Sequence, residues 1–218
     1  MFLPKRAAAP YQAVAYFPGS SAINSRNIEP IDTRNIDFLL KSGRSVVFPV
    51  YKGTYERGGG ITSDYPNMSA NWRDHMVMIA KDLGRTIDYL SSRPDIAADR
   101  IGYFGQSWGA AMGAWLPAIE SRLKAAVLAV GGLYQQRSLP EADAFNFTPR
   151  VRIPTLMLSG RYDFFFPTQS SQEPMFALLG APFSDKKRIV YDTGHAIPRN
   201  ELIKETLDWF DRYLGPTQ

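Results

Sequence analysis

The chain has 218 residues, of which 44% are hydrophobic and 13% aromatic, a composition typical of a folded protein that argues against disorder. Its net charge is +4, but basic and acidic residues are interleaved and no run of five basic residues occurs, which gives nucleic-acid binding little support. Cysteine is absent, so disulfides and thiolate metal sites are excluded.

The chain contains no apolar run long enough for a membrane-spanning helix, and its first residues lack the apolar core of a signal peptide. We therefore expect a cytoplasmic protein with no membrane or nucleic-acid partner. Its two histidines lie far apart, so we also expect no metal site and no cofactor.

Apolar strands and helices alternate along the chain, with no internal repeat and no linker that would divide it. The pattern therefore predicts a single domain over residues 1–218. Strands are expected at 12–17, 45–51, up to 104, 125–130, 155–159 and 187–191, and helices at 34–41, 69–92, directly after 107, near 169–179 and at 200–214.

The longest predicted helix, at 69–92, begins with Ser69 as a good N-cap and ends before Pro94. Apolar residues recur in it at intervals of three and four, which places one apolar stripe toward a core. The stripe consists of Trp72, Met76, Ile79, Leu83, Ile87 and Leu90. The final helix shows a similar stripe, made of Leu202, Ile203, Leu207, Phe210 and Leu214, and should stop at Gly215.

Alternating strands and helices predict an α/β fold, in which helices cover both faces of a mostly parallel sheet. In such sheets the chemistry lies at the carboxyl ends of the strands. Gly19, Ser107, Asp163 and His195 each follow a predicted strand closely. We expect all four to gather at this rim.

Residues 100–111 place Ser107 where a nucleophile would be built. A short apolar strand leads into Gly105-Gln106-Ser107-Trp108-Gly109, and helix-forming residues follow. The turn brings the backbone too close to its neighbours for side chains at 105 and 109, and the helix aims its N-terminal dipole at the nascent charge.

A serine hydroxyl needs a base, and histidine is the best-tuned base near neutral pH. His75 falls inside the long helix, far from any strand end, and is expected to be a partly exposed helical residue. His195 falls in the loop between the last strand and the last helix, from which it can reach back to Ser107.

The base needs a carboxylate that fixes its tautomer, and Asp163 follows the strand at 155–159. The order serine, acid, histidine is the one expected for this arrangement. Asp143 is the rival acid, whereas Asp192 is too near His195 in sequence and is expected to cap its loop.

The tetrahedral intermediate of acyl transfer requires two backbone N–H donors. The amide of Trp108, directly after the nucleophile, is expected to be one of them. The turn Phe17-Pro18-Gly19-Ser20 should supply the other, with the Ser20 amide favoured.

Together, Phe17-Pro18-Gly19-Ser20, Gly105 to Gly109, Gly160-Arg161-Tyr162-Asp163 and Gly194-His195 resemble motifs of the α/β-hydrolase superfamily, near its dienelactone-hydrolase and prolyl-oligopeptidase-like branches. Segments 51–57 and 163–167 are also similar to a hydrolase domain found C-terminal to some bacterial serine/threonine protein kinases. The resemblance spans essentially the whole chain. It implies a three-layer fold and a serine hydrolase with Ser107, Asp163 and His195 as triad and Ser20 and Trp108 as oxyanion donors.

Two features depart from the family pattern. Many members carry histidine where this chain has Pro18, and we expect the family's first antiparallel strands to be missing or truncated in this sequence. The strand at 45–51 would then be a sheet edge open to pairing with another chain. We expect a homodimer on this basis.

Only 24 residues, 131–154, lie where lid domains usually occur, too few for a full lipase cap. An open site favours soluble esters with short acyl groups, and Tyr51, Tyr55 and Phe164 are candidates to bind this small-molecule substrate. The first hypothesis is a carboxylic-ester hydrolase. The alternatives are a prolyl-oligopeptidase-like serine peptidase and a non-catalytic interaction domain with a hydrolase fold.

Overall fold

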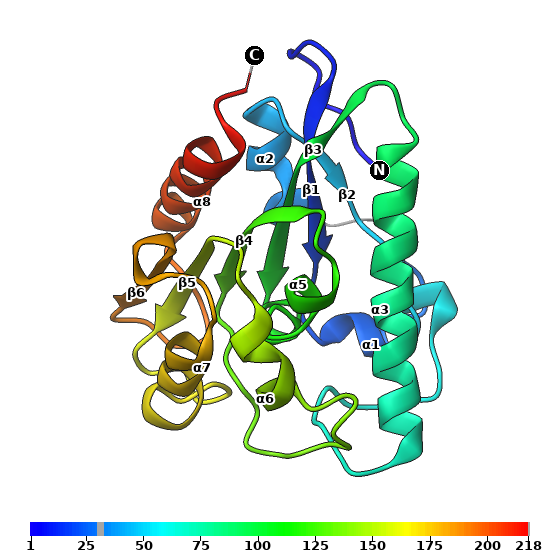
Figure 1. Ribbon diagram of the computed structural model, residues 1–218, viewed down its shortest axis with the longest axis vertical. Helices are drawn as coiled ribbons and strands as arrows, with labels where there is room; N and C mark the ends of the chain where they lie inside the picture. Colours follow the sequence, from blue (N-terminus) through cyan, green and yellow to red (C-terminus); the bar gives the residue numbers. More distant parts are fainter. Residues whose placement is uncertain (30–32, 218) are drawn as a thin grey trace.

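Six strands form one parallel sheet in the computed structural model, which describes residues 1–29 and 33–217 (Figure 1). Their order across the sheet is β2-β1-β3-β4-β5-β6, and every neighbouring pair is parallel. The strands are β1 (Tyr11–Phe17), β2 (Ser45–Val47), β3 (Ile96–Gln106), β4 (Leu123–Ala129), β5 (Thr155–Gly160) and β6 (Lys186–Tyr191). The parallel sheet predicted from the alternating pattern is confirmed.

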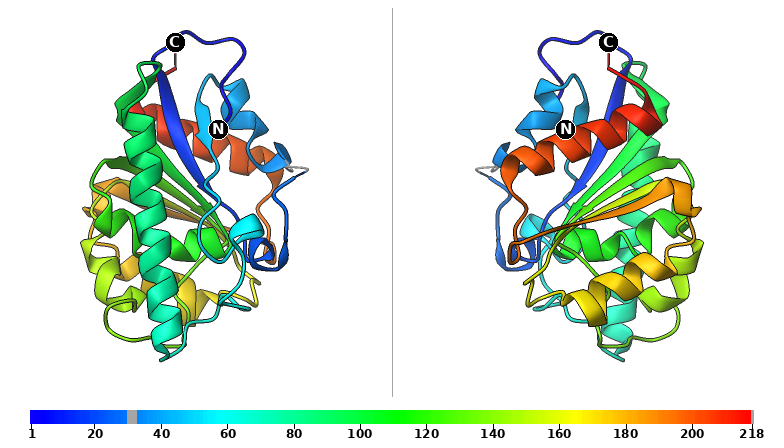
Figure 2. Two further views of the ribbon diagram at one scale, coloured as in Figure 1. Left: turned by 90° about the vertical axis from the view of Figure 1, so that its right-hand side faces the viewer. Right: turned by 90° about the vertical axis from the view of Figure 1, so that its left-hand side faces the viewer.

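Helices cover both faces of this sheet (Figure 2). The helices are α1 (Ser21–Asn24), α2 (Asp37–Lys41), α3 (Ala70–Ser91), α4 (Trp108–Met112), α5 (Leu116–Ile119), α6 (Ala144–Phe147), α7 (Glu173–Leu178) and α8 (Arg199–Leu214). Helix α3 lies on one side, and α2 and α8 lie on the other. This three-layer arrangement is the α/β-hydrolase fold.

Strand β1 shows how the sequence divides the core into two parts. Ala13, Ala15 and Phe17 belong to the apolar cluster under α3, whereas Val14 and Tyr16 belong to the cluster under α2 and α8. Successive side chains of a strand point to opposite faces, so a strand buried on both sides reads as a continuous apolar run.

Helix α3 forms where the apolar spacing predicts it. The Ser69 hydroxyl caps its first turn by accepting a hydrogen bond from the Trp72 amide at 3.1 Å. All six residues of the predicted stripe are buried. Within the described part of the chain, no helix has both the length and the hydropathy needed to cross a bilayer.

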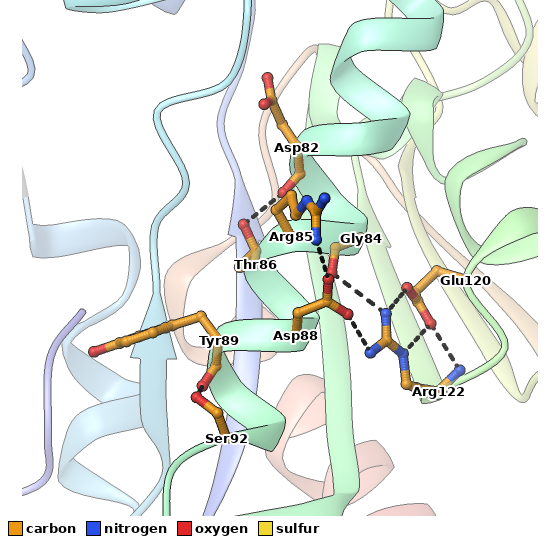
Figure 3. A network of polar contacts seen from close by, with 9 residues as sticks. All are labelled: Asp82, Gly84, Arg85, Thr86, Asp88, Tyr89, Ser92, Glu120 and Arg122. Atoms are coloured by element: carbon orange, nitrogen blue, oxygen red, sulfur yellow. Dashed lines mark hydrogen bonds and ion pairs between the residues drawn. The ribbon is translucent and has the colours of Figure 1, made fainter.

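Arg122, just before β4, ties α3 to the neighbouring layer (Figure 3). Its guanidinium donates to both carboxylate oxygens of Glu120, at 2.8 and 2.6 Å, and to Asp88 of α3 at 2.8 Å. It also donates to the Gly84 carbonyl of α3. These paired ionic hydrogen bonds raise the pKa of Arg122 and fix the helix at the end of the sheet away from the carboxyl ends of the strands.

Most predicted strands and helices agree with those observed to within two residues at the ends compared, and three elements differ more. Strand β2 ends at Val47 rather than at residue 51, because Pro49 has no N–H to donate to a ladder. The segment predicted as a helix at 34–41 divides into a 3₁₀ turn at Thr33–Asn35 and helix α2. The segment near 169–179 begins with one π-helical turn, Thr168–Gln172, before α7.

The first residues and the segment that follows α8 lie at the end of the molecule opposite the carboxyl ends of the strands (Figure 1). Phe2 forms an antiparallel bridge with Val46 of β2, with N–H to O=C hydrogen bonds of 2.8 and 3.0 Å in the two directions. The Gln12 side-chain amide donates to the carbonyls of Leu214 and Gly215 and holds the end of α8. The rim at the carboxyl ends of the strands is therefore formed by the loops that follow the strands.

Candidate active site

Ser107 lies at the junction of β3 and α4, in a strained backbone conformation. Its φ is 54° and its ψ is −114°, values that a residue with a side chain rarely adopts. The Ser107 amide donates to the Ala129 carbonyl of β4 at 2.9 Å, and its own carbonyl accepts from Ala111 at 2.9 Å. The hydrogen bonds to β4 and within α4 therefore fix the turn that places the Ser107 hydroxyl at the carboxyl end of the sheet.

The glycines on either side of Ser107 allow two close backbone approaches. A Cβ at Gly109 would lie 2.0 Å from the Phe17 carbonyl oxygen of β1, and a Cβ at Gly105 would lie 2.3 Å from the Gly109 carbonyl oxygen. No side chain fits at either position. The steric role predicted for both glycines agrees with these distances, although Gly105 faces the start of α4 rather than a neighbouring strand.

A continuous chain of hydrogen bonds links Ser107, His195 and Asp163. His195 Nε2 lies 2.9 Å from Ser107 Oγ, and His195 Nδ1 lies 2.8 Å from Asp163 Oδ2. An ionised carboxylate only accepts, so Nδ1 carries the proton and donates it to Asp163. In the neutral imidazole, Nε2 is then the acceptor for the Ser107 hydroxyl.

The Asp163 carboxylate is fixed on both of its oxygens. Its side chain is fully buried, and Oδ1 accepts hydrogen bonds from the amides of Phe165 and Phe166 at 3.0 and 3.1 Å. Buried charge is tolerated when hydrogen bonds surround it. The loop after β5 thus supplies a carboxylate whose orientation is set before the imidazole binds to it.

Two further features bring the acid and base loops together, and neither contact was predicted from the sequence. A Cβ at Gly160 would lie 1.9 Å from the Gly194 carbonyl oxygen, so only glycine lets the exits of β5 and β6 meet. The buried Gln172 side chain donates to the carbonyls of Gly160 and Phe166, at 2.9 and 2.7 Å. The Gly160 to Asp163 spacing pointed to the first feature, but no sequence signal marks Gln172.

The turn after β1 lies directly beside the serine. The Gly109 amide donates to the Pro18 carbonyl at 3.0 Å, and a Cβ at Gly19 would lie 3.3 Å from Ser107 Cβ. Ser20 is the N-cap of α1, and Trp108 is the first residue of α4. Amides in the first turn of a helix have no intrahelical acceptor, which leaves the Trp108 N–H available beside the hydroxyl.

A cleft of about 480 Å³ opens over Ser107 and His195. Loops after five of the strands contribute to it, and so does the segment between β2 and α3. Its lining includes Tyr16, Gly19, Ser20, Tyr55, Asp64, Tyr65, Gln106, Val130, Tyr134, Phe165 and Phe166. Tyr55, one of the three residues predicted to contact substrate, is among them.

The other two residues predicted to contact substrate do not line the cleft. Tyr51 is fully buried and stacks on Phe17 with ring centroids 5.0 Å apart, so it belongs to the core beneath the site. Phe164 is 74% exposed and lies outside against Phe165. Phe165 and Phe166 line the cleft in its place because their amides bind Asp163 and turn the loop inward.

The acidic and histidine residues outside the triad that the sequence analysis considered have other partners. Asp143 caps α6 by accepting from the Phe145 amide at 3.0 Å and pairs with Arg137. Asp192 is exposed and pairs with Arg161 rather than capping its own loop. His75, expected to be partly exposed, is only 5% exposed, and its ring contacts the carbonyls of Asn71 and Gly59.

Within residues 1–29 and 33–217, no group of three histidine or acidic side chains is arranged to hold a metal ion. The chemistry available at the described site is that of a hydroxyl, an imidazole and a carboxylate in sequence. Hydrogen bonds in this order can activate the hydroxyl as a nucleophile.

The sequence matches the dienelactone hydrolase family over residues 3–200, which is most of the chain. This chain belongs to the dienelactone hydrolase family. The kinase-associated branch remains a resemblance of motifs only.

A curated relative, the Bacillus subtilis protein YtaP, is 32% identical over 92 residues, which cover 42% of this chain and 31% of YtaP. The match thus spans about a third of that relative's length. Among solved structures, an esterase from an Arctic intertidal metagenomic library has a TM-score of 0.71 at 19% identity, covering 96% of this chain and 84% of the esterase. The acetyl xylan esterase of Paenibacillus sp. R4 has a TM-score of 0.69 at 18% identity, covering 95% and 76%. At these identities the likeness shows the fold.

Proposed function

We propose that this protein is a carboxylic-ester hydrolase that cleaves short-chain acyl esters through an acyl-serine intermediate on Ser107. The observation that carries the proposal is the pair of hydrogen bonds, 2.9 Å from Ser107 Oγ to His195 Nε2 and 2.8 Å from His195 Nδ1 to Asp163 Oδ2. Family membership supports hydrolysis, and the geometry supports serine as the nucleophile.

In the acylation step, Ser107 Oγ attacks the ester carbonyl carbon while its proton passes to His195 Nε2. Asp163 stabilises the imidazolium that forms and does not itself take the proton. The amides of Ser20 and Trp108 donate to the carbonyl oxygen as it becomes negative. The intermediate then breaks the bond to the alcohol oxygen, which receives the proton from Nε2.

In the deacylation step, water replaces the alcohol. His195 takes a proton from the water, and the resulting hydroxide attacks the acyl carbon. Collapse of the second intermediate returns the proton to Ser107 Oγ and releases the carboxylic acid. The enzyme regains its initial protonation state.

The short-chain preference follows from how little covers the cleft. Between β4 and β5 the chain forms only the four-residue helix α6 and a 3₁₀ turn, Thr148–Arg150. A long acyl chain gains affinity by burial in an apolar cavity, and about 25 cal/mol is gained for each Å² removed from water. An uncovered cleft offers little of that gain to acyl groups beyond the first few carbons.

The test is steady-state hydrolysis of p-nitrophenyl esters from acetate to dodecanoate by the wild-type protein and by Ser107→Ala. We expect kcat/KM to be highest for the two- to four-carbon esters, and Ser107→Ala to lower it by about 10⁴-fold or more. An anilide with the same acetyl group should react far more slowly than the ester. Equal rates for wild type and Ser107→Ala would contradict the mechanism, and a faster anilide would indicate a peptidase.

A further inference from the structure

The cleft has two different sides, which the order of the strands defines. Ser107 follows β3, with β1 and β2 on one side of it and β4, β5 and β6 on the other. The turn at Gly19 and Ser20 lies on the first side. Tyr134, Phe165, Phe166 and His195 follow the strands of the second side.

The mechanism assigns the alcohol part of an ester to the second side. The oxygen that leaves must receive its proton from His195 Nε2, so it faces the imidazole, whereas the carbonyl oxygen faces the amides beside β1. Whatever the alcohol oxygen carries therefore extends over the residues that follow β4, β5 and β6.

An aromatic wall runs along this second side from the imidazole outward. The Phe165 ring lies 4.8 Å from the His195 ring, and Phe166 lies 5.1 Å from Tyr134. The Tyr65 ring comes from the segment between β2 and α3, on the first side, and meets the second side where it packs against Tyr134, with ring centroids 5.5 Å apart at an angle of 67°. Two rings at such an angle form a corner.

A carboxylate lies at this corner. The Tyr134 hydroxyl donates a hydrogen bond to Asp64 Oδ2, and both residues line the cleft. Among the described residues, neither lysine nor arginine lines the cleft, and no ion pair involves Asp64. Burial and the Asp64 charge raise the pKa of Tyr134, so its hydroxyl stays a donor at neutral pH.

Aromatic ring faces together with a carboxylate recognise positively charged nitrogen, because the ring quadrupole and the anion both attract a cation. The same charge disfavours anionic substrates, since no described basic side chain in the cleft would offset the repulsion. Asp64 lines the cleft, and its carboxylate can accept more hydrogen bonds than the one from Tyr134.

We propose that the cleft takes esters of alcohols that carry an ammonium group, with the cation bound by Asp64 at the corner formed by Tyr65 and Tyr134. The substrate class rests on the esterase function proposed above, whereas the cation site itself does not. Asp64 acts here as a binding residue and takes no part in the bond-breaking steps.

The test compares two acetates of the same shape, acetylcholine and 3,3-dimethylbutyl acetate, in which carbon replaces the charged nitrogen. The wild type should hydrolyse the cationic ester with a kcat/KM about tenfold above that of the neutral one. Asp64→Asn should bring the ratio close to one, since asparagine still accepts from Tyr134 but carries no charge.

Two control variants separate this site from other effects. Asp192→Asn removes a carboxylate from the exposed loop beside His195, and the ratio should remain unchanged because Asp192 pairs with Arg161 outside the cleft. Tyr134→Phe keeps both the ring and the Asp64 carboxylate, so the preference for the cationic ester should persist. A preference lost equally in all three variants would overturn the assignment to Asp64.

Binding of choline, measured by titration calorimetry, makes the test independent of turnover. Choline should bind the wild type about tenfold more tightly than Asp64→Asn, with unchanged melting temperatures showing that both are folded. If the wild type hydrolyses the neutral ester but neither prefers the cationic ester nor binds choline, the cation site is overturned and the esterase proposal stands. Choline binding without hydrolysis of either ester overturns the esterase proposal and supports the cation site.

Discussion

Asp163 uses its two carboxylate oxygens for different partners. Oδ2 accepts from His195, whereas Oδ1 accepts from the amides of Phe165 and Phe166. The hydrogen bond to Oδ2 selects the tautomer in which Nε2 can accept the Ser107 proton. The proposed mechanism therefore depends on the charge of Asp163 as well as on its position.

Replacing Asp163 with asparagine should lower kcat by about 10³- to 10⁴-fold with little change in fold. The asparagine NH₂ would donate to Nδ1 and move the imidazole proton to Nε2, where it blocks acceptance from Ser107. Hydrolysis of p-nitrophenyl acetate measures the loss. Asp143→Asn is the matched control, and we expect near wild-type kcat with a stability loss below about 1 kcal/mol, because asparagine still caps α6 and only the ion pair with the exposed Arg137 is lost. An equal loss in the control would show that Asp163 has no special role.

Sequence reasoning at this scale works where a residue directly follows a strand. Ser107, Asp163 and His195 could be predicted to meet because parallel strands end at the same rim. Tyr51 and Phe164 could not be assigned, because the direction of a side chain in a loop follows no periodicity. The Tyr134 contact with Asp64 joins two such loops, and nothing in the sequence predicts it.

At the scale of elements, His75 positions the glycine-rich loop at residues 53–62, which precedes α3. The ring lies between the Asn71 carbonyl, 2.8 Å from Nδ1, and the Gly59 carbonyl, 3.3 Å from Nε2. Gly59 and Gly60 both have a φ of 90°. The loop leads on to Asp64 and Tyr65, so its position sets one wall of the cleft.

Gly59→Ala and Gly60→Ala form a matched pair that tests this packing. Both carry the strain of positive φ, about 1–2 kcal/mol. A Cβ at Gly60 would also lie 2.2 Å from His75 Nε2, whereas nothing lies within 4 Å of one at Gly59. We expect urea unfolding to show Gly60→Ala less stable than Gly59→Ala by at least about 1 kcal/mol. Equal stabilities would mean that His75 does not hold the loop.

Helices α2 and α8 are joined by Asp37, which accepts from Lys41 and from Arg199, both at 2.7 Å. The hydrogen bond from Lys41, aided by Arg199 and opposed by partial burial, lowers the pKa of Asp37 below its ordinary 3.8. A lowered folded-state pKa stabilises the fold above the unfolded pKa, and this contribution is lost as pH falls through the folded value.

Asp37→Asn should therefore cost less than about 1 kcal/mol at pH 7, because both partners are partly exposed. The difference in unfolding free energy between Asp37→Asn and the wild type should become smaller as the pH is lowered from about 7 toward 3. Urea unfolding at a series of pH values measures it. A difference that stays constant down to the lowest pH would show that the ion pair does not cause it.

The ends of an element could be predicted where the apolar periodicity extends over several turns and a capping or helix-ending residue follows or precedes it. The stripe and Ser69 cap of α3, and the end of α8 at Gly215, are examples. The predicted extent of β2 was wrong. The apolar run continues to residue 51, but strand pairing cannot continue past Pro49. Trp209 is buried in α8 without belonging to the predicted stripe, because the wide contact of α8 with the sheet includes a second row.

At the scale of the whole molecule, β2 is the sheet edge from which the homodimer is predicted. Phe2 already pairs with Val46 on the outer side of this edge, so the open part is shorter than the sequence indicates. Sedimentation across a range of concentrations tests the prediction. A dimer would agree with the prediction, and a monomer at all concentrations would contradict it.

The central claim is that Ser107 is a nucleophile activated by His195. Its most direct test is labelling of the folded protein with a fluorophosphonate probe, followed by mass spectrometry of its peptides. We expect one adduct on Ser107 in the wild type, none in Ser107→Ala, and labelling slowed by at least about 10³-fold in His195→Ala. A folded wild-type protein that stays unlabelled at Ser107, or a His195→Ala variant labelled at the wild-type rate, would contradict the account.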